Sequence, residues 1–140
     1  GFLLYRACHG SAVGPPGQAA SIAACTDEAH VIANREQYRQ KFAEVTPLLA
    51  TVMEVSLPDA GFYLWADVSK LAPGGDDVAF ALALLAQYNV AVLPGSLLAR
   101  EVDGVNPGAG RIRLALVSET SDCLEATQRI VAFAESLRRT

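Results

Sequence analysis

Apolar side chains recur at steps of three and four positions between residues 27 and 52, which is the spacing of a helix with one buried face. These positions are Val31, Tyr38, Phe42, Val45, Leu48 and Leu49. Charged and amide side chains, including Lys41, lie between them and are assigned to the opposite face. The pattern predicts a long amphipathic helix that Pro47 kinks or breaks. Before it, the Ala-rich run 15–26 starts with two prolines and predicts a helix with small faces for close packing.

Three apolar runs after the long helix predict β-strands. The runs span residues 62–68, 90–93 and 111–117, and Pro94 is expected to end the second. In the third run, alternation places Ile112 and Leu114 on one face of the strand, and Arg111 and Arg113 on the other. The third strand therefore has an apolar face that can pack against a core and a basic face whose two arginines have no role in such a core.

Two further helices and a loop complete the predicted elements. Asp76 is a suitable N-cap for a helix that ends near Asn89, and the glycines within 99–110 predict an exposed loop. A final amphipathic helix begins near Thr120. Its predicted inward positions are Cys123, Thr127, Ile130, Ala134 and Leu137. The order of elements predicts an α/β or α+β domain in which a small sheet is covered by helices.

Composition narrows the class of protein. The chain has 140 residues, of which 51% are hydrophobic and 19% charged, as in one soluble globular domain. A net charge of −4 with scattered basic residues excludes a nucleic-acid surface, and the apolar runs are too interrupted to span a membrane. Three cysteines without a Cys-x-x-Cys spacing indicate a reducing compartment, so we expect a cytoplasmic protein.

Histidine and cysteine give weak signals of chemistry. His9 and His30 lack the spacing of a metal site, so no metal is expected. Cys8 is next to His9, but adjacent side chains do not generally reach the geometry of a thiolate–imidazole pair, which favours a semi-buried structural thiol. His30 is a residue of the long helix. The loop that contains His9 and Ser11 fits either a structural or an active-site role.

Arg113 is the more informative residue. An arginine in the middle of a strand that otherwise buries apolar side chains has two explanations. It either lies across the surface or presents a planar guanidinium to an anion. The pattern alone favours the surface.

Three strings in this order resemble the C-terminal part of fold-type I pyridoxal-phosphate (PLP) aminotransferases. They are Gly61-Phe62-Tyr63-Leu64-Trp65, Val92-Leu93-Pro94-Gly95-Ser96 and Arg113-Leu114-Ala115-Leu116, the last followed by an amphipathic helix. The segments 5–10, 18–24 and 27–31 are similar to bacterial N-succinyl-diaminopimelate aminotransferases in particular, which serve the diaminopimelate route to lysine. The resemblance covers nearly the whole chain.

The resemblance implies a domain organisation and a missing cofactor lysine. Residues 1–26 would be the end of a large domain and the start of the connecting helix, and residues 27–140 the C-terminal small domain. The family holds PLP through a lysine in a Ser-Lys-x-x-x-x-Pro-Gly-x-Arg-x-Gly motif, which is absent. The Ser-Lys-Leu-Ala-Pro-Gly run at 69–74 has the wrong spacing and no following arginine. The chain is therefore expected to begin just after the catalytic lysine, to bind no cofactor and to be inactive alone.

The resemblance also assigns binding residues and partners. Arg113 would grip the substrate α-carboxylate, and Arg111 is a weaker candidate for a distal carboxylate. The 9–11 loop would lie near a dimer interface, and the Gly61–Trp65 run is interpreted as a core strand. The intact enzyme would be a homodimer with PLP that moves an amino group from an amino acid such as glutamate to a keto acid. The alternative is a free-standing α/β module that binds a small carboxylate without cofactor chemistry.

Overall fold

The computed structural model describes residues 2, 4–5, 9–10 and 13–139. The chain divides into two compact units, Gly1–Glu36 and Gln37–Thr140. The division falls within helix α3 (Glu28–Leu49), after Glu36. The domain boundary that the resemblance implies after residue 26 stays a prediction.

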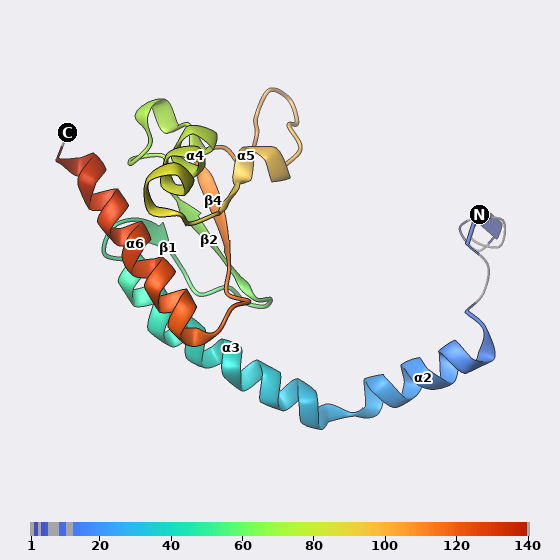
Figure 1. Cartoon of the computed structure of the whole chain (residues 1–140). Helices are drawn as coiled ribbons and strands as arrows, with labels where there is room; N and C mark the ends of the chain where they lie inside the picture. Colours follow the sequence, from blue (N-terminus) through green and yellow to red (C-terminus); the bar gives the residue numbers. More distant parts are fainter. Residues whose placement is uncertain (1, 3, 6–8, 11–12, 140) are drawn as a thin grey trace. The chain divides into compact units, whose positions relative to one another are not determined.

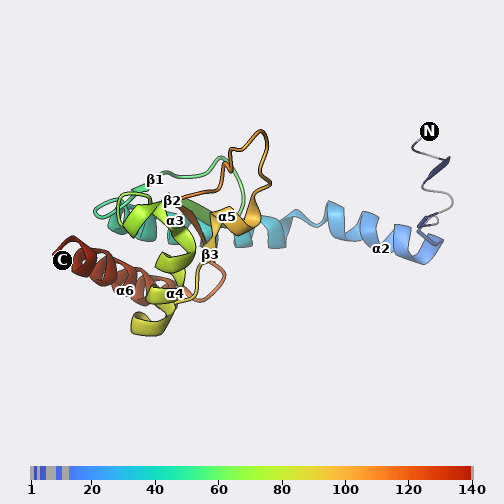
Figure 2. The same ribbon diagram turned by 90° about the horizontal axis from the view of Figure 1, so that it is seen from above.

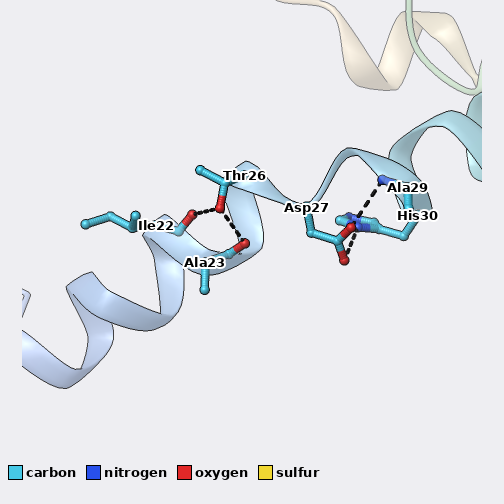
Figure 3. A network of polar contacts seen from close by, with 6 residues as sticks. All are labelled: Ile22, Ala23, Thr26, Asp27, Ala29 and His30. Atoms are coloured by element: carbon cyan, nitrogen blue, oxygen red, sulfur yellow. Dashed lines mark hydrogen bonds and ion pairs between the residues drawn. The ribbon is translucent and has the colours of Figure 1, made fainter.

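The first unit consists mainly of helix α2 (Pro15–Thr26) and the beginning of α3, as the sequence predicts. Figure 3 shows the joint between the two helices. The Thr26 hydroxyl donates to the carbonyls of Ile22 and Ala23, at 2.9 and 3.0 Å. Asp27 then accepts a hydrogen bond from the Ala29 amide at 3.1 Å, and its second oxygen lies 3.3 Å from His30 Nδ1. Asp27 thereby satisfies a free amide at the start of α3, the usual role of an N-cap residue.

The second unit is built on a four-stranded antiparallel sheet with the order β1-β2-β4-β3. The strands are β1 (Glu54–Val55), β2 (Tyr63–Asp67), β3 (Leu93–Pro94) and β4 (Arg111–Ala115). The longest pairing joins β2 to β4, from Tyr63 opposite Ala115 to Asp67 opposite Arg111 (Figure 1). The central strands are therefore the two that carry the aromatic run and the arginines.

One face of this sheet forms the hydrophobic core with three helices. Leu64 and Ala66 of β2, and Ile112 and Leu114 of β4, are buried in one cluster. The same cluster contains Phe42, Val45 and Leu49 of α3, Phe80 and Leu84 of α4 (Asp77–Tyr88), and Cys123, Ile130, Phe133 and Ala134 of α6 (Thr120–Arg138). Figure 2 shows α4 and α6 on the same side of the sheet. The expected small sheet covered by helices is confirmed, and the opposite face is free of these helices.

The segment 90–94 differs from the prediction. Only Leu93 and Pro94 pair with β4, so the expected strand over 90–93 is confirmed at Leu93 and wrong for 90–92. Pro94 belongs to the strand instead of stopping it. Proline is acceptable there because β3 is an edge strand, where a missing amide donor breaks no inner ladder. The short helix α5 (Gly95–Leu98), the 3-10 turn η1 (Pro73–Gly75) and β1 were not predicted.

Pro47 neither breaks α3 nor removes a buried hydrogen bond. The helix continues past it and ends at Leu49. The carbonyl four positions earlier belongs to Ala43, an exposed residue, so water can replace the amide that proline lacks.

The assignment of Lys41 to an exposed, charged face of the long helix is wrong, because the residue is only 7% exposed. Its ammonium donates to the carbonyl of Leu116 at 3.1 Å and to that of Ser118 at 2.5 Å, and lies 5.1 Å from the centre of the Tyr38 ring. Burial raises the pKa of the neighbouring Cys123 thiol, and the charge of Lys41 opposes this rise. Lys41 therefore fastens the chain that leaves β4 to helix α3.

Two glycines allow α5 to lie directly against the 99–110 loop. A Cβ on Gly108 would be 2.1 Å from the Gly95 carbonyl oxygen, too close for any side chain. The Asn106 amide donates to the Ser96 carbonyl at 2.8 Å, and the buried Asp77 carboxylate accepts from the Ser96 amide at 2.7 Å. These contacts fix the segment that follows β3.

Candidate functional site

The sheet face opposite the core gathers aromatic and charged side chains from the two central strands. Alternation along β2 turns Leu64 and Ala66 into the core and leaves the flanking residues on the other face. These outer-face residues are Tyr63, Trp65 and Asp67 of β2, and Arg111 and Arg113 of β4. The interpretation of the Gly61–Trp65 run as core therefore describes Leu64 but not Tyr63 or Trp65. The alternation from Tyr63 to Asp67 was the sequence signal that could have revealed this.

Arg113 lies at the centre of this outer face. Its Cα is in register with Trp65 of β2 on one side and Leu93 of β3 on the other. Its guanidinium carbon lies 5.3 Å from the centre of the Tyr63 ring. Within the described part of the chain, its Nε–H is buried without a hydrogen-bond partner, and no carboxylate pairs with it. A buried donor on a permanent cation is costly unless an acceptor meets it, so this arrangement suits an incoming anion.

Arg111 has a partner of its own. Its Nη2 lies 3.6 Å from Asp67 Oδ2, directly across the strand pair. Asp67 also accepts from the Ser69 hydroxyl at 2.6 Å and from the Ser69 amide at 2.9 Å. The Ser69 hydroxyl lowers the pKa of Asp67 below its usual value, and the charge of Arg111 lowers it further. Asp67 is thus held in its ionised form, and a ligand carboxylate would have to compete with it for Arg111.

The other sequence candidates belong to the first unit or lie outside the described residues. The His9 ring stacks on Tyr5 with a centroid distance of 4.5 Å, and His30 pairs with Asp27. Cys8 and Ser11 are not among the described residues. Where the structure describes the chain, it brings together no set of three metal-ligating side chains. In that same part, none of the helices combines the length and apolarity needed to cross a membrane.

A hollow of about 340 Å³ lies elsewhere, between the 89–92 segment, the end of β4 and the first half of α6. Leu114, Cys123 and Arg129 line it, whereas Arg113 does not. Arg129 is already engaged there, since it donates to the Tyr88 carbonyl at 3.3 Å and pairs with Glu125. Because the Arg113 guanidinium has no polar partner in the described part of the chain, the outer sheet face is the stronger candidate.

Comparison with known proteins identifies the class to which this fold and face belong. The family model for aminotransferase class I and II matches residues 7–130. The chain therefore belongs to the class I and II aminotransferase family, whose members use PLP in the intact enzyme.

Particular relatives agree with this assignment. A probable aminotransferase of Mycobacterium tuberculosis is 35% identical over 130 residues, which cover 91% of this chain and 28% of the relative. The crystal structure of an aminotransferase from Neisseria meningitidis is 50% identical with a TM-score of 0.82, and the match covers 94% of this chain and 32% of that one. A probable N-succinyldiaminopimelate aminotransferase from Thermus thermophilus is 32% identical with a TM-score of 0.61, over 77% of this chain and 27% of that one. The chain thus spans about a third or less of each relative.

The two lysines of this chain stand in different surroundings. Lys41 is buried with its ammonium bonded to two carbonyls, and Lys70 is exposed in the loop after β2. A Schiff base needs an accessible amine, which the buried Lys41 does not offer, and Lys70 stands in a run without the spacing of the Ser-Lys-x-x-x-x-Pro-Gly-x-Arg motif.

We therefore expect incubation of the 140-residue chain with PLP, followed by borohydride reduction, to give no stoichiometric label on either lysine. Peptide mapping by mass spectrometry measures the label at each position. A single dominant modification at Lys70 would contradict this expectation, and reduction after unfolding in denaturant controls for the reactivity of the buried Lys41.

Proposed function

We propose that this chain is the C-terminal part of a PLP-dependent aminotransferase and that Arg113 binds the α-carboxylate of its amino-acid and keto-acid substrates. The observation that carries the proposal is the half-buried guanidinium of Arg113, which has an unpartnered Nε–H and no carboxylate partner among the described residues. Membership in the aminotransferase family supplies the class of substrate.

The geometry explains why an arginine serves this role. A guanidinium binds a carboxylate through two parallel hydrogen bonds, which determine the position of the carboxylate and also its plane. Fixing that plane orients the bonds at the adjacent α-carbon, where amino transfer occurs. Because Arg113 stands on a central strand between Trp65 and Leu93, its backbone is held on both sides. The strand pairings thus supply the rigidity that such positioning requires.

For the substrate, we propose a keto acid of the succinyl-diaminopimelate type, with glutamate as the amino donor. The support is the sequence resemblance together with the Thermus thermophilus neighbour, which is described as a probable N-succinyldiaminopimelate aminotransferase. Arg111 is the second candidate on the same face and would reach a distal carboxylate only by leaving Asp67.

The remaining parts of the proposal concern the polypeptide outside this chain. A large domain would supply the cofactor lysine, since the matched relatives are about three times as long and this chain lacks the Ser-Lys-x-x-x-x-Pro-Gly-x-Arg motif. The intact enzyme would be a cytoplasmic homodimer, and the 140 residues alone would be inactive.

An assay of the full-length protein tests the function. We expect the full-length protein to consume glutamate in the presence of N-succinyl-2-amino-6-ketopimelate and PLP, and the 140-residue chain to show no turnover under the same conditions. Pyruvate and oxaloacetate as alternative acceptors report the substrate range. A coding sequence with no Ser-Lys...Pro-Gly-x-Arg segment upstream of Gly1, and no turnover with any acceptor, would contradict the proposal and favour a carboxylate-binding module.

A further inference from the structure

We propose that Tyr63 is a positioning residue, whose ring holds the Arg113 guanidinium ready for a substrate carboxylate. This inference rests on the proposed role of Arg113 and concerns a residue to which the sequence analysis gave only a place in a core strand. The contact that motivates it is the distance of 5.3 Å between the guanidinium carbon and the centre of the Tyr63 ring. A cation within about 6 Å of an aromatic centroid is attracted by the negative face of the ring.

The strand register makes this contact possible. Trp65 is directly opposite Arg113, and Tyr63 is opposite Ala115, so Tyr63 and Arg113 are diagonal neighbours on the outer face. Diagonal pairs lie within reach of aromatic and other long side chains. Ala115, directly opposite Tyr63, is small and leaves room for the ring to lean toward the arginine.

Among the described residues, no polar partner fixes the guanidinium. Arg113 has neither a hydrogen bond nor an ion pair there, and its other in-register neighbour, Leu93, is aliphatic. An arginine side chain without polar partners loses rotamer freedom when it binds a ligand, which weakens binding. A ring that restrains the side chain beforehand reduces this entropic cost and leaves the hydrogen-bonding edge free.

The Tyr63 ring is itself supported by other aromatic rings. The Phe62 ring meets it edge-on at 5.6 Å, and Phe62 in turn lies 6.1 Å from Tyr38 of α3. The Tyr63 hydroxyl makes no hydrogen bond to any residue that the structure describes, so the ring and not the hydroxyl supplies the contact. Phenylalanine at position 63 should therefore retain the contact with the Arg113 guanidinium, whereas leucine should lose it.

The test uses the full-length enzyme and compares Tyr63→Leu, Tyr63→Phe and Leu93→Ala. The readouts are KM for glutamate and the inhibition constant of glutarate, an unreactive dicarboxylate. We expect Tyr63→Leu to raise both constants roughly 3- to 30-fold, with kcat at saturation little changed. Tyr63→Phe should restore both constants. Leu93→Ala shortens the side chain in register with Arg113 on the other side and should leave both constants near the wild-type values.

A second measurement preserves the size of the side chain and so does not depend on the folding of Tyr63→Leu. Phenylalanine analogues with increasing fluorine substitution at position 63 weaken the negative ring face at nearly constant shape. Both constants should rise steadily with fluorine number. Unchanged constants across this series, or an equal rise in Leu93→Ala, would overturn the positioning role.

The failure of this inference differs from the failure of the proposed function. If Arg113→Lys raises both constants while Tyr63→Leu and the fluorinated series leave them unchanged, Arg113 binds the carboxylate without help from Tyr63. If Arg113→Lys also leaves them unchanged, the proposed role of Arg113 is wrong. If Arg113 binds the carboxylate and Tyr63 positions it, Tyr63→Leu should raise the two constants less in an Arg113→Lys background than in the wild-type protein.

Discussion

Replacing Arg113 by lysine in the full-length protein is expected to lower the proposed aminotransferase activity, as kcat/KM, roughly 30- to 1,000-fold, which corresponds to about 2–4 kcal/mol of transition-state binding. Lysine retains the charge but loses the planar pair of donors that binds both oxygens of a carboxylate. Folding should be little affected, because Arg113 extends from the strand face opposite the core residues Ile112 and Leu114. Steady-state kinetics with glutamate, together with a thermal melt of the variant, measures both effects.

Arg111→Lys is the matched control, since it lies two residues away on the same face of β4. Its guanidinium already pairs with Asp67, so we expect a much smaller loss of kcat/KM than for Arg113→Lys. Small and equal losses for the two variants would show that Arg113 is an ordinary surface residue.

Replacing Lys41 by methionine is expected to lower the free energy of unfolding by about 2–4 kcal/mol, because one buried and one partly buried carbonyl lose their donor. Those carbonyls belong to Leu116 and Ser118, immediately after β4. Methionine fills much of the same volume, so lost hydrogen bonds and not an empty cavity should dominate the effect. Urea denaturation followed by circular dichroism gives the free energy.

Lys70→Met serves as the control for loss of a positive charge. Lys70 is exposed in the loop after β2, and its replacement should change the free energy of unfolding by less than about 0.5 kcal/mol. If Lys41→Met were as mild as Lys70→Met, solvent would be reaching the two carbonyls, and Lys41 would not fasten β4 to α3.

Local periodicity was sufficient to predict most elements of the second unit. The steps of three and four apolar residues located α3 and α6, and Asp76 and Asn89 marked the ends of α4. Such patterns succeed because a helix face or strand face is set by the backbone repeat of a few neighbouring residues. The same reasoning placed Arg113 on the strand face opposite Ile112 and Leu114, where the structure has it.

Contacts between distant segments were decided only by the tertiary structure. Lys41 belongs to a polar stretch of its helix, yet it is buried because the carbonyls of Leu116 and Ser118 arrive within reach of its ammonium. The partner of a long flexible side chain depends on packing and cannot be found from helix periodicity.

In the candidate site, too, local periodicity predicted some features and only the tertiary structure decided others. The sequence alone determined that an arginine would stand on the polar face of a central apolar strand. Only the antiparallel register of β2 with β4 decided that Tyr63 would lie diagonally beside Arg113 and that Asp67 would face Arg111. A shift of one residue in that register would turn the β2 side chains to the other face, and strand propensity contains no information about such pairing.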